Sequence, residues 1–301
     1  MSHGFSRRVW VVLIAAVALA AGALAALGLG GAPMVAGPRL IHEEPSQFAP
    51  VVVFDHNGER CMSFNTIDDA GRQTCFRLSD PDKMVFEYTR MMTSALFAVP
   101  APNSVLVIGL GGGTLPTALA GILPHAVIDS VEIDPAVVQV AQTFFGYRPG
   151  PRQRVFVQDG REFVEQAGRS GASYDLIMLD AFDVDYIPAH LLTVEFLQQV
   201  KAILAPEGAL VANSFARSDM YERESATYAA VFGAFFNLRS RLDGNRVIIA
   251  MPGGLPPHTI LEQNAQALSG RLAPFGIDVE TALSRFSAKP DWNDEAQPLR
   301  D

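Results

Sequence analysis

Residues 49–98 show short apolar stretches separated by polar turns. Residues 51–54 and 60–64 flank Asn57-Gly58, a pair typical of a two-residue turn between antiparallel strands, so they predict a β-hairpin. A further strand is expected at 73–78 and a helix at 82–97. This part of the chain is therefore predicted to form a small β-sheet followed by a helix.

From residue 104 the pattern changes: the run at 105–108 is short and wholly apolar, and strand-like segments then alternate with helical ones. Such runs are typical of strands buried on both faces of a sheet, and their alternation with helices predicts parallel βαβ units. A last hairpin at 238–242 and 246–251 breaks the alternation. We therefore expect a doubly wound, mostly parallel, seven-stranded α/β sheet. Its other strands are predicted at 105–108, 127–133, 155–158, 176–179 and 209–213, and its helices at 115–122, 135–145, 161–167 and 193–204.

The N-terminus carries a long uncharged run. Residues 9–30 contain no charged side chain, and as a helix they would span about 33 Å, enough to cross a membrane. A membrane anchor and a cleaved secretory signal both fit, and we expect the anchor because the run is longer than a usual signal core. Arg7 and Arg8 precede the run, which favours a cytoplasmic N-terminus and a body on the far side, although two arginines are modest topological evidence. We expect a single-pass membrane protein. The sequence leaves open on which side of the membrane its catalytic domain lies.

The pattern divides the chain into five parts. Residues 1–30 are the stub and anchor or signal, 31–48 a linker, and 49–98 the small β-domain with its helix. Residues 99–290 form the catalytic domain, and 291–301 are expected to be a disordered tail.

Net charge and cysteine content indicate which classes of ligand the protein could bind. A net charge of −9 argues against binding nucleic acid through a general basic surface and suits a cationic substrate. Cys61 and Cys75 are expected to be two core thiols, with a disulfide across a hairpin as the alternative. Without a histidine and cysteine cluster, we expect no metal site.

Glycines follow the first parallel strand. Such a loop lets the backbone approach a ligand, and the next helix offers its first amides to it. Alone, this signal is shared by dinucleotide and sulfonium cofactor sites. The glycines are Gly109, Gly111, Gly112 and Gly113.

Acidic residues follow the next three strands. Glu132 ends the second strand, where a carboxylate can accept both hydroxyls of a ribose, and Asp134 is expected to cap the following helix. Asp159, followed by Gly160, could accept from an adenine amine, cap a helix, or do both. Asp180 and Asp183 follow the fourth strand, where substrate meets cofactor, and could hold an ammonium group and take its proton.

Taken together, these motifs resemble those of the spermidine synthases and their bacterial relatives, a branch of the class I S-adenosylmethionine-dependent methyltransferase superfamily. The resemblance covers about residues 50–250 and is carried by VLVIGLGGG (105–113), VEIDP (131–135), QDGREF (158–163) and YDLIMLDAFD (174–183). It implies a class I methyltransferase-like fold with a small N-terminal β-domain, and it leaves a homodimer open.

The resemblance also implies roles for individual residues. Glu132 would hold the ribose, Asp159 the adenine, and Asp180 the attacking amine, with Asp183 assisting. Gln73 and Tyr88 would line the substrate pocket.

The sequence departs from the family at the glycine loop. An aspartate that would anchor the amine of the decarboxylated co-substrate is replaced by Gly112. We expect aminopropyl transfer from decarboxylated S-adenosylmethionine to a diamine such as putrescine. Methyl transfer from intact S-adenosylmethionine is the alternative, and a membrane-tethered binding protein without turnover is a third reading.

Overall fold

The computed structural model describes residues 37–67, 71–181, 188–217, 219–240 and 244–301. The expected membrane segment, 9–30, lies outside the described residues. Within those ranges, no helix is both long and apolar enough to cross a membrane. The chain divides into residues 1–37 and 38–301, and every helix and strand of the described part belongs to the second unit.

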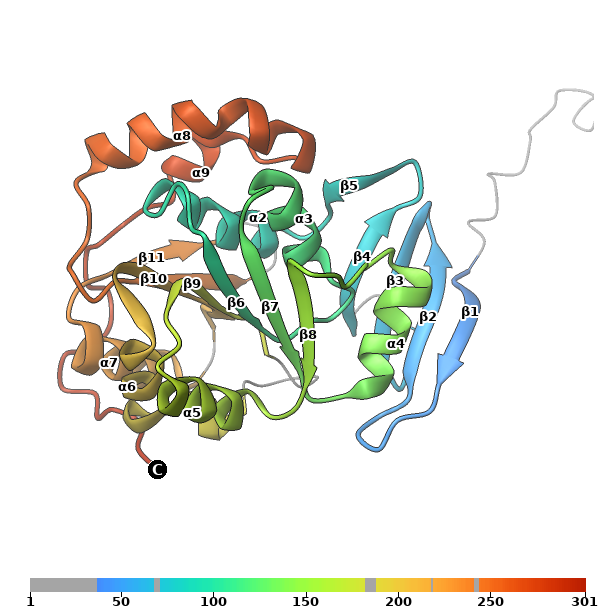
Figure 1. The fold of residues 1–301 in the computed structure, drawn as a ribbon, viewed down its shortest axis with the longest axis horizontal. Helices are drawn as coiled ribbons and strands as arrows, with labels where there is room; N and C mark the ends of the chain where they lie inside the picture. Colours follow the sequence, from blue (N-terminus) through green and yellow to red (C-terminus); the bar gives the residue numbers. More distant parts are fainter. Residues whose placement is uncertain (1–36, 68–70, 182–187, 218, 241–243) are drawn as a thin grey trace, which may run out of the picture. The chain divides into compact units, whose positions relative to one another are not determined.

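A five-stranded antiparallel sheet precedes the large domain (Figure 1). Its strands lie in sequence order, and the predicted hairpin is confirmed. Asn57 and Gly58 both have positive φ, 51° and 79°, as a tight turn between twisted strands requires. The strands are β1 (Arg39–Glu44), β2 (Val51–His56), β3 (Glu59–Phe64), β4 (Arg72–Arg77) and β5 (Asp80–Met84).

Two strands of this sheet correct the sequence prediction. The linker expected at 31–48 contains β1, an edge strand whose Leu40 is 49 % exposed, so its apolar pattern is faint. The helix expected at 82–97 is wrong in its first turn, because residues 80–84 pair with β4 as strand β5. The chain becomes helical only at α2 (Glu87–Thr93) and the 3₁₀ turn η1 (Ser94–Phe97).

The large domain is built on a seven-stranded sheet, as predicted. Its strand order is β11-β12-β10-β9-β6-β7-β8. Neighbours from β10 to β8 are parallel, and β12 runs antiparallel to both β10 and β11. The strands are β6 (Ser104–Ile108), β7 (Val127–Glu132), β8 (Gln153–Val157), β9 (Tyr174–Leu179), β10 (Leu204–Phe215), β11 (Phe235–Arg239) and β12 (Asn245–Ala250).

Helices cover both faces of this sheet (Figure 1). One core contains side chains of α2, α3 and α8, and the other contains side chains of α5, α6 and α7. Helix α4 packs its valines against β2 and β3, which attaches the small sheet to the large domain. The helices are α3 (Thr114–Ile122), α4 (Pro135–Phe144), α5 (Gly160–Ser170), α6 (Val194–Ala202), α7 (Tyr221–Phe232), α8 (His258–Leu272) and α9 (Val279–Leu283), with 3₁₀ turns η2 (Ala189–Leu191) and η3 (Ala273–Phe275).

The C-terminal segment differs from the disordered tail expected at 291–301. Trp292 stacks on Phe235 with 4.7 Å between ring centroids, and Leu299 is buried. The amide of Val194 donates to the Leu299 carbonyl at 2.9 Å, and Arg161 pairs with the Asp301 side chain. The segment has no helical or strand periodicity, so these isolated anchors left no pattern in the sequence.

Candidate active site

The carboxyl ends of β6, β7, β8 and β9 meet at one edge of the large sheet. A cavity lies there, lined by the glycine loop, by three carboxylates and by residues of β4 and α2 from the N-terminal part of the chain. The edge where parallel strands end, next to the point where strand order reverses, is the usual ligand site of such a sheet. The sequence therefore predicted the right edge.

The glycine loop crosses closely over the end of β9. Gly109, Gly111 and Gly113 have φ of 93°, 51° and 79°, values that L side chains rarely adopt. A side chain at Gly109 would overlap the carbonyl oxygen of Asp180. The loop therefore needs glycine both for its turn and for its contact with the strand that carries Asp180.

Glu132 lines the cavity and hydrogen-bonds the glycine loop. Its Oε2 accepts the amide of Leu110 at 3.0 Å, and its Oε1 accepts the amide of Asp134 at 3.1 Å. Burial raises the pKa of Glu132, and hydrogen bonds from the amides of Leu110, Asp134 and Gly111 oppose that effect. Asp134 caps α4, as expected, by accepting the amide of Ala136 at 2.8 Å.

Asp159 caps α5 and also faces the cavity. Its Oδ1 accepts the amides of Arg161 and Glu162 at 2.8 and 3.1 Å, and its Oδ2 lies 2.9 Å from Nε2 of His190. Burial disfavours the charged form, but the Glu162 amide and the His190 ring outweigh it and lower the pKa of Asp159. Gly160, next along the chain, has no room for a side chain beside Ile108.

Asp180 is a buried carboxyl of the cavity whose pKa is raised. Burial raises its pKa from 3.8 to about 7, and hydrogen bonds from Asn213 and Tyr88 oppose that rise. The Asn213 amide donates to Oδ1 at 2.9 Å, and the Tyr88 hydroxyl donates to Oδ2 at 3.4 Å. A carboxyl poised near neutrality is suited to exchanging a proton at physiological pH.

Five further residues complete the comparison with the sequence. Tyr88 and Gln73 line the cavity, whereas Asp183 lies outside the described residues. Sequence reasoning missed Asn213, whose only signal was a polar residue at the end of a buried strand. His190, from the turn η2, also lines the cavity and contacts Asp159.

Gly112 faces a wall that leaves no room for a side chain. A Cβ there would lie 2.5 Å from Cγ2 of Thr74 and 3.0 Å from the ring of Phe145. The Thr74 hydroxyl lies 3.1 Å from that of Thr114. This part of the cavity is therefore lined by neutral hydroxyls where an acidic side chain cannot be accommodated.

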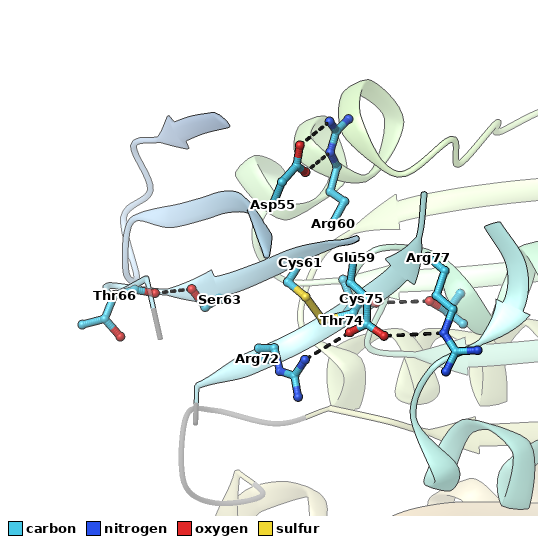
Figure 2. Close-up of a disulfide and its surroundings, with 11 residues drawn as sticks. Asp55, Glu59, Arg60, Cys61, Ser63, Thr66, Arg72, Thr74, Cys75 and Arg77 are labelled. Carbon is cyan, nitrogen blue, oxygen red and sulfur yellow. Dashed lines mark hydrogen bonds and ion pairs between the residues drawn. A yellow bond between two sulfur atoms is a disulfide. The ribbon is translucent and has the colours of Figure 1, made fainter. Parts of the chain in front are cut away.

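Behind this wall, Cys61 and Cys75 form a disulfide (Figure 2). The expected pair of free core thiols is wrong, and the alternative holds. The two cysteines are direct partners in the β3–β4 register, with Cα atoms 4.1 Å apart. On the same strands, Glu59 forms ion pairs with Arg72 and Arg77 at 3.2 and 3.6 Å (Figure 2).

Comparisons with known proteins agree with this geometry. The chain is 43 % identical over 264 residues to the polyamine aminopropyltransferase of Vibrio vulnificus, covering 87 % of this chain and 88 % of that protein. It is 34 % identical over 206 residues to the human eEF1A lysine and N-terminal methyltransferase, covering 64 % of this chain but only 28 % of that longer protein. A crystal structure of spermidine synthase in complex with the transition state analogue AdoDATO has the same fold, with a TM-score of 0.63 and 20 % identity over 82 % of this chain and 88 % of that one.

A family profile described as "Spermine/spermidine synthase domain" matches residues 85–236. This match and the Vibrio relative lead to one conclusion: the chain belongs to the spermine/spermidine synthase family of transferases.

Proposed function

We propose that the protein transfers an aminopropyl group from decarboxylated S-adenosylmethionine to a diamine such as putrescine. The observation that carries this proposal is the buried Asp180 carboxyl, with a pKa of about 7, in one cavity with the glycine loop and Glu132. The Vibrio relative that shares most of the chain is named for the same reaction.

The nucleoside end of the co-substrate would lie against β7 and β8. Glu132 accepts backbone amides on both oxygens, and its carboxylate has further lone pairs that could accept ribose hydroxyls. Asp159 would accept the adenine amine on Oδ2, the oxygen that also contacts His190. The glycine loop would follow the chain that leads to the sulfonium.

Asp180 would act on the acceptor. It would take a proton from the ammonium group of the diamine, and the freed amine would attack the carbon adjacent to sulfur. A C–N bond forms as the C–S bond breaks, and the electron pair of that bond stays on the sulfur of methylthioadenosine. Holding amine and carbon in line accounts for much of the rate, and no covalent enzyme intermediate is needed. Asp183 would assist, while Gln73 and Tyr88 line the acceptor side.

Methyl transfer is the second candidate, and the wall around Gly112 favours it. Thr74 excludes an acidic side chain at this position, so no carboxylate there would repel an intact S-adenosylmethionine. The human relative is named as a methyltransferase. Both reactions use the same nucleoside site and differ in the group that the cavity accepts.

Calorimetric titration of the full-length protein separates the candidates. The ligands are decarboxylated S-adenosylmethionine, the intact form and methylthioadenosine, each with the wild type and with Glu132→Ala. Tighter binding of the decarboxylated form, weakened by Glu132→Ala, together with conversion of putrescine to spermidine, supports aminopropyl transfer. Preference for the intact form supports methyl transfer. If the folded protein binds none of the three ligands, both enzyme hypotheses fail and a non-catalytic protein that retains the fold remains.

We further propose, on the sequence alone, that residues 9–30 attach the protein to a membrane. Retention in the membrane fraction after an alkaline wash, and its loss when 9–30 are replaced by a polar linker, tests the anchor. A reporter fused after Asp301 identifies the side. The homodimer and the absence of a metal and of nucleic-acid binding stay predictions.

A further inference from the structure

The two oxygens of Asp180 have different partners. Oδ1 accepts a hydrogen bond from Nδ2 of Asn213 at 2.9 Å, a good distance for a charge-assisted bond. Oδ2 has the longer contact, 3.4 Å to the Tyr88 hydroxyl. Because an N–H group already points at Oδ1, a proton on that oxygen would collide with it. A proton taken up by Asp180 is therefore directed to Oδ2.

This asymmetry depends on which way the Asn213 amide faces. An asparagine side chain presents an NH₂ on one side and a carbonyl on the other, and its neighbours decide which group faces which partner. Here Oδ1 of Asn213 accepts a hydrogen bond from Nδ2 of Asn245 at 3.0 Å. That bond holds the carbonyl toward Asn245 and leaves the NH₂ facing Asp180.

The sheet register places the three residues in a row. Leu179, just before Asp180, pairs with Ala212 on the neighbouring β10, which puts Asn213 beside Asp180. On the other side of β10, Asn245 is the partner of Phe215, two residues beyond Asn213. Positions two residues apart point to the same face of a sheet, so Asn213 and Asn245 are diagonal neighbours on that face.

We propose that Asn213 and Asn245 are positioning residues that orient Asp180 and select Oδ2 as the oxygen that takes the proton. The proposal rests on the proposed function in giving Asp180 the role of proton acceptor. Neither asparagine needs to touch a ligand: Asn213 is buried behind Asp180, and Asn245 acts through Asn213.

The other titratable groups that line the same cavity are Tyr88 from α2, Glu132 from β7, Asp159 from the β8–α5 connection and His190 from η2. Asn213 and Tyr88 are the groups that oppose the effect of burial on Asp180. Weakening the Asn213 bond should therefore raise the pKa of Asp180 further.

The test follows Asp180 directly and does not need turnover. In full-length protein labelled with ¹³C at aspartate carboxyls, the Asp180 signal is identified by its loss in Asp180→Asn and then titrated. The variants are Asn213→Ala, Asn245→Ala and Asn245→Asp. The last keeps the side-chain shape but can only accept, so the Asn213 amide must turn its NH₂ away from Asp180. Asn264→Asp is the matched control, because Asn264 also donates an amide hydrogen bond, to the Phe97 carbonyl, on remote helix α8.

We expect the pKa of Asp180 to rise by about one unit or more in all three variants and to stay unchanged in Asn264→Asp. The added charge in Asn245→Asp could raise the pKa by itself, so the uncharged Asn245→Ala decides. With putrescine as acceptor, kcat should fall about tenfold or more while KM changes less, because a misdirected base reduces the rate and not the binding.

If the pKa of Asp180 and the kcat of folded Asn245→Ala both equal those of the wild type, the proposal is overturned. Failure of the proposed function looks different: the wild type would then turn over no diamine, while the Asp180 titration would still report whether the two asparagines orient the carboxyl.

Discussion

The Tyr88 hydroxyl donates to Oδ2 of Asp180 at 3.4 Å, although 92 residues separate the two along the chain. Tyr88 lies in α2, directly after the small sheet, and Asp180 follows β9 of the large one. The cavity is therefore completed by a segment that precedes the large sheet.

The first prediction concerns this contact. Tyr88→Phe removes a donor from the oxygen that we propose takes the proton, and the bond is long, so the effect should be modest. We expect kcat to fall about fivefold, equivalent to about 1 kcal/mol, in a steady-state assay. Tyr228→Phe, which changes a buried tyrosine of the opposite core, should leave kcat unchanged. Equal effects of the two variants on kcat would show that the Tyr88 hydroxyl has no specific role in the reaction.

The second prediction uses the pKa of Asp180. Its value of about 7 lies above the ordinary 3.8, so between these values the folded state binds more protons than the unfolded state. The free energy of unfolding then decreases as pH rises from about 4 to about 7. Asp180→Asn should stabilise the protein at pH 8, by at most about 4 kcal/mol, and change little at pH 4, as thermal melts at both values would measure.

Asp159→Asn is the control with the opposite sign. The pKa of Asp159 is lowered, so its ionised form stabilises the folded state above pH 4, and that contribution is lost as pH falls. Replacement should destabilise the protein at pH 8 and matter less in acid.

The pKa of Asp180 also predicts the pH dependence of activity. The acid limb of kcat/KM should lie near pH 7 in the wild type, and a limb near pH 4 would contradict the buried state of Asp180.

Much of the large sheet could be predicted because most of its strands are buried on both faces. Leu106 and Val107 are fully buried neighbours, so both sides of β6 read as apolar. The edge strands β1 and β5 were missed because pairing with one neighbour holds them, and they have few buried side chains. Helix α8 was not predicted, although its buried residues follow helical spacing: Leu261, Ala265, Leu268 and Leu272.

The residues of the site also fall into those that the sequence predicts and those that it does not. Glu132, Asp159 and Asp180 could be found because each follows a strand of the parallel sheet, where topology alone brings them to one edge. Asn213 and Thr74 could not, since their positions depend on the β9–β10 register and on how the small sheet lies against the glycine loop. The sequence therefore predicts carboxylates more readily than the neutral groups that orient them.

The third prediction concerns the wall at Gly112. Gly112→Ala puts a methyl group 2.5 Å from Cγ2 of Thr74, so the loop or β4 must shift. We expect weaker binding of methylthioadenosine in calorimetry. Thr74→Ala removes both Cγ2 and the hydroxyl, so the double variant should recover much of the lost affinity. An equally weak double variant would mean that Thr74 does not set the space at Gly112.

In the Thr74→Ala background, Gly112→Asp tests whether a charge at this position changes which co-substrate the protein prefers. A carboxylate at this position should attract the ammonium of decarboxylated S-adenosylmethionine and repel the carboxylate of the intact form. We expect the ratio of their affinities to move about tenfold or more toward the decarboxylated form. Gly112→Asn in the same background has the same shape without the charge, and a ratio that moves equally in both variants would exclude a charge effect.

The last prediction concerns the disulfide between Cys61 and Cys75, which are 14 residues apart and lie on β3 and β4 (Figure 2). Closing a loop of this length should contribute about 3 kcal/mol to the free energy of unfolding, mainly by restricting the unfolded chain. Dithiothreitol should therefore lower the midpoint of denaturant unfolding of the wild type and leave the Cys61→Ala/Cys75→Ala double variant unchanged. Thr74, next to Cys75, lines the cavity, so reduction should also raise KM for the co-substrate. Free thiols on peptide mapping of native protein, with no response to reductant, would show that the two strands are held by their backbone hydrogen bonds alone.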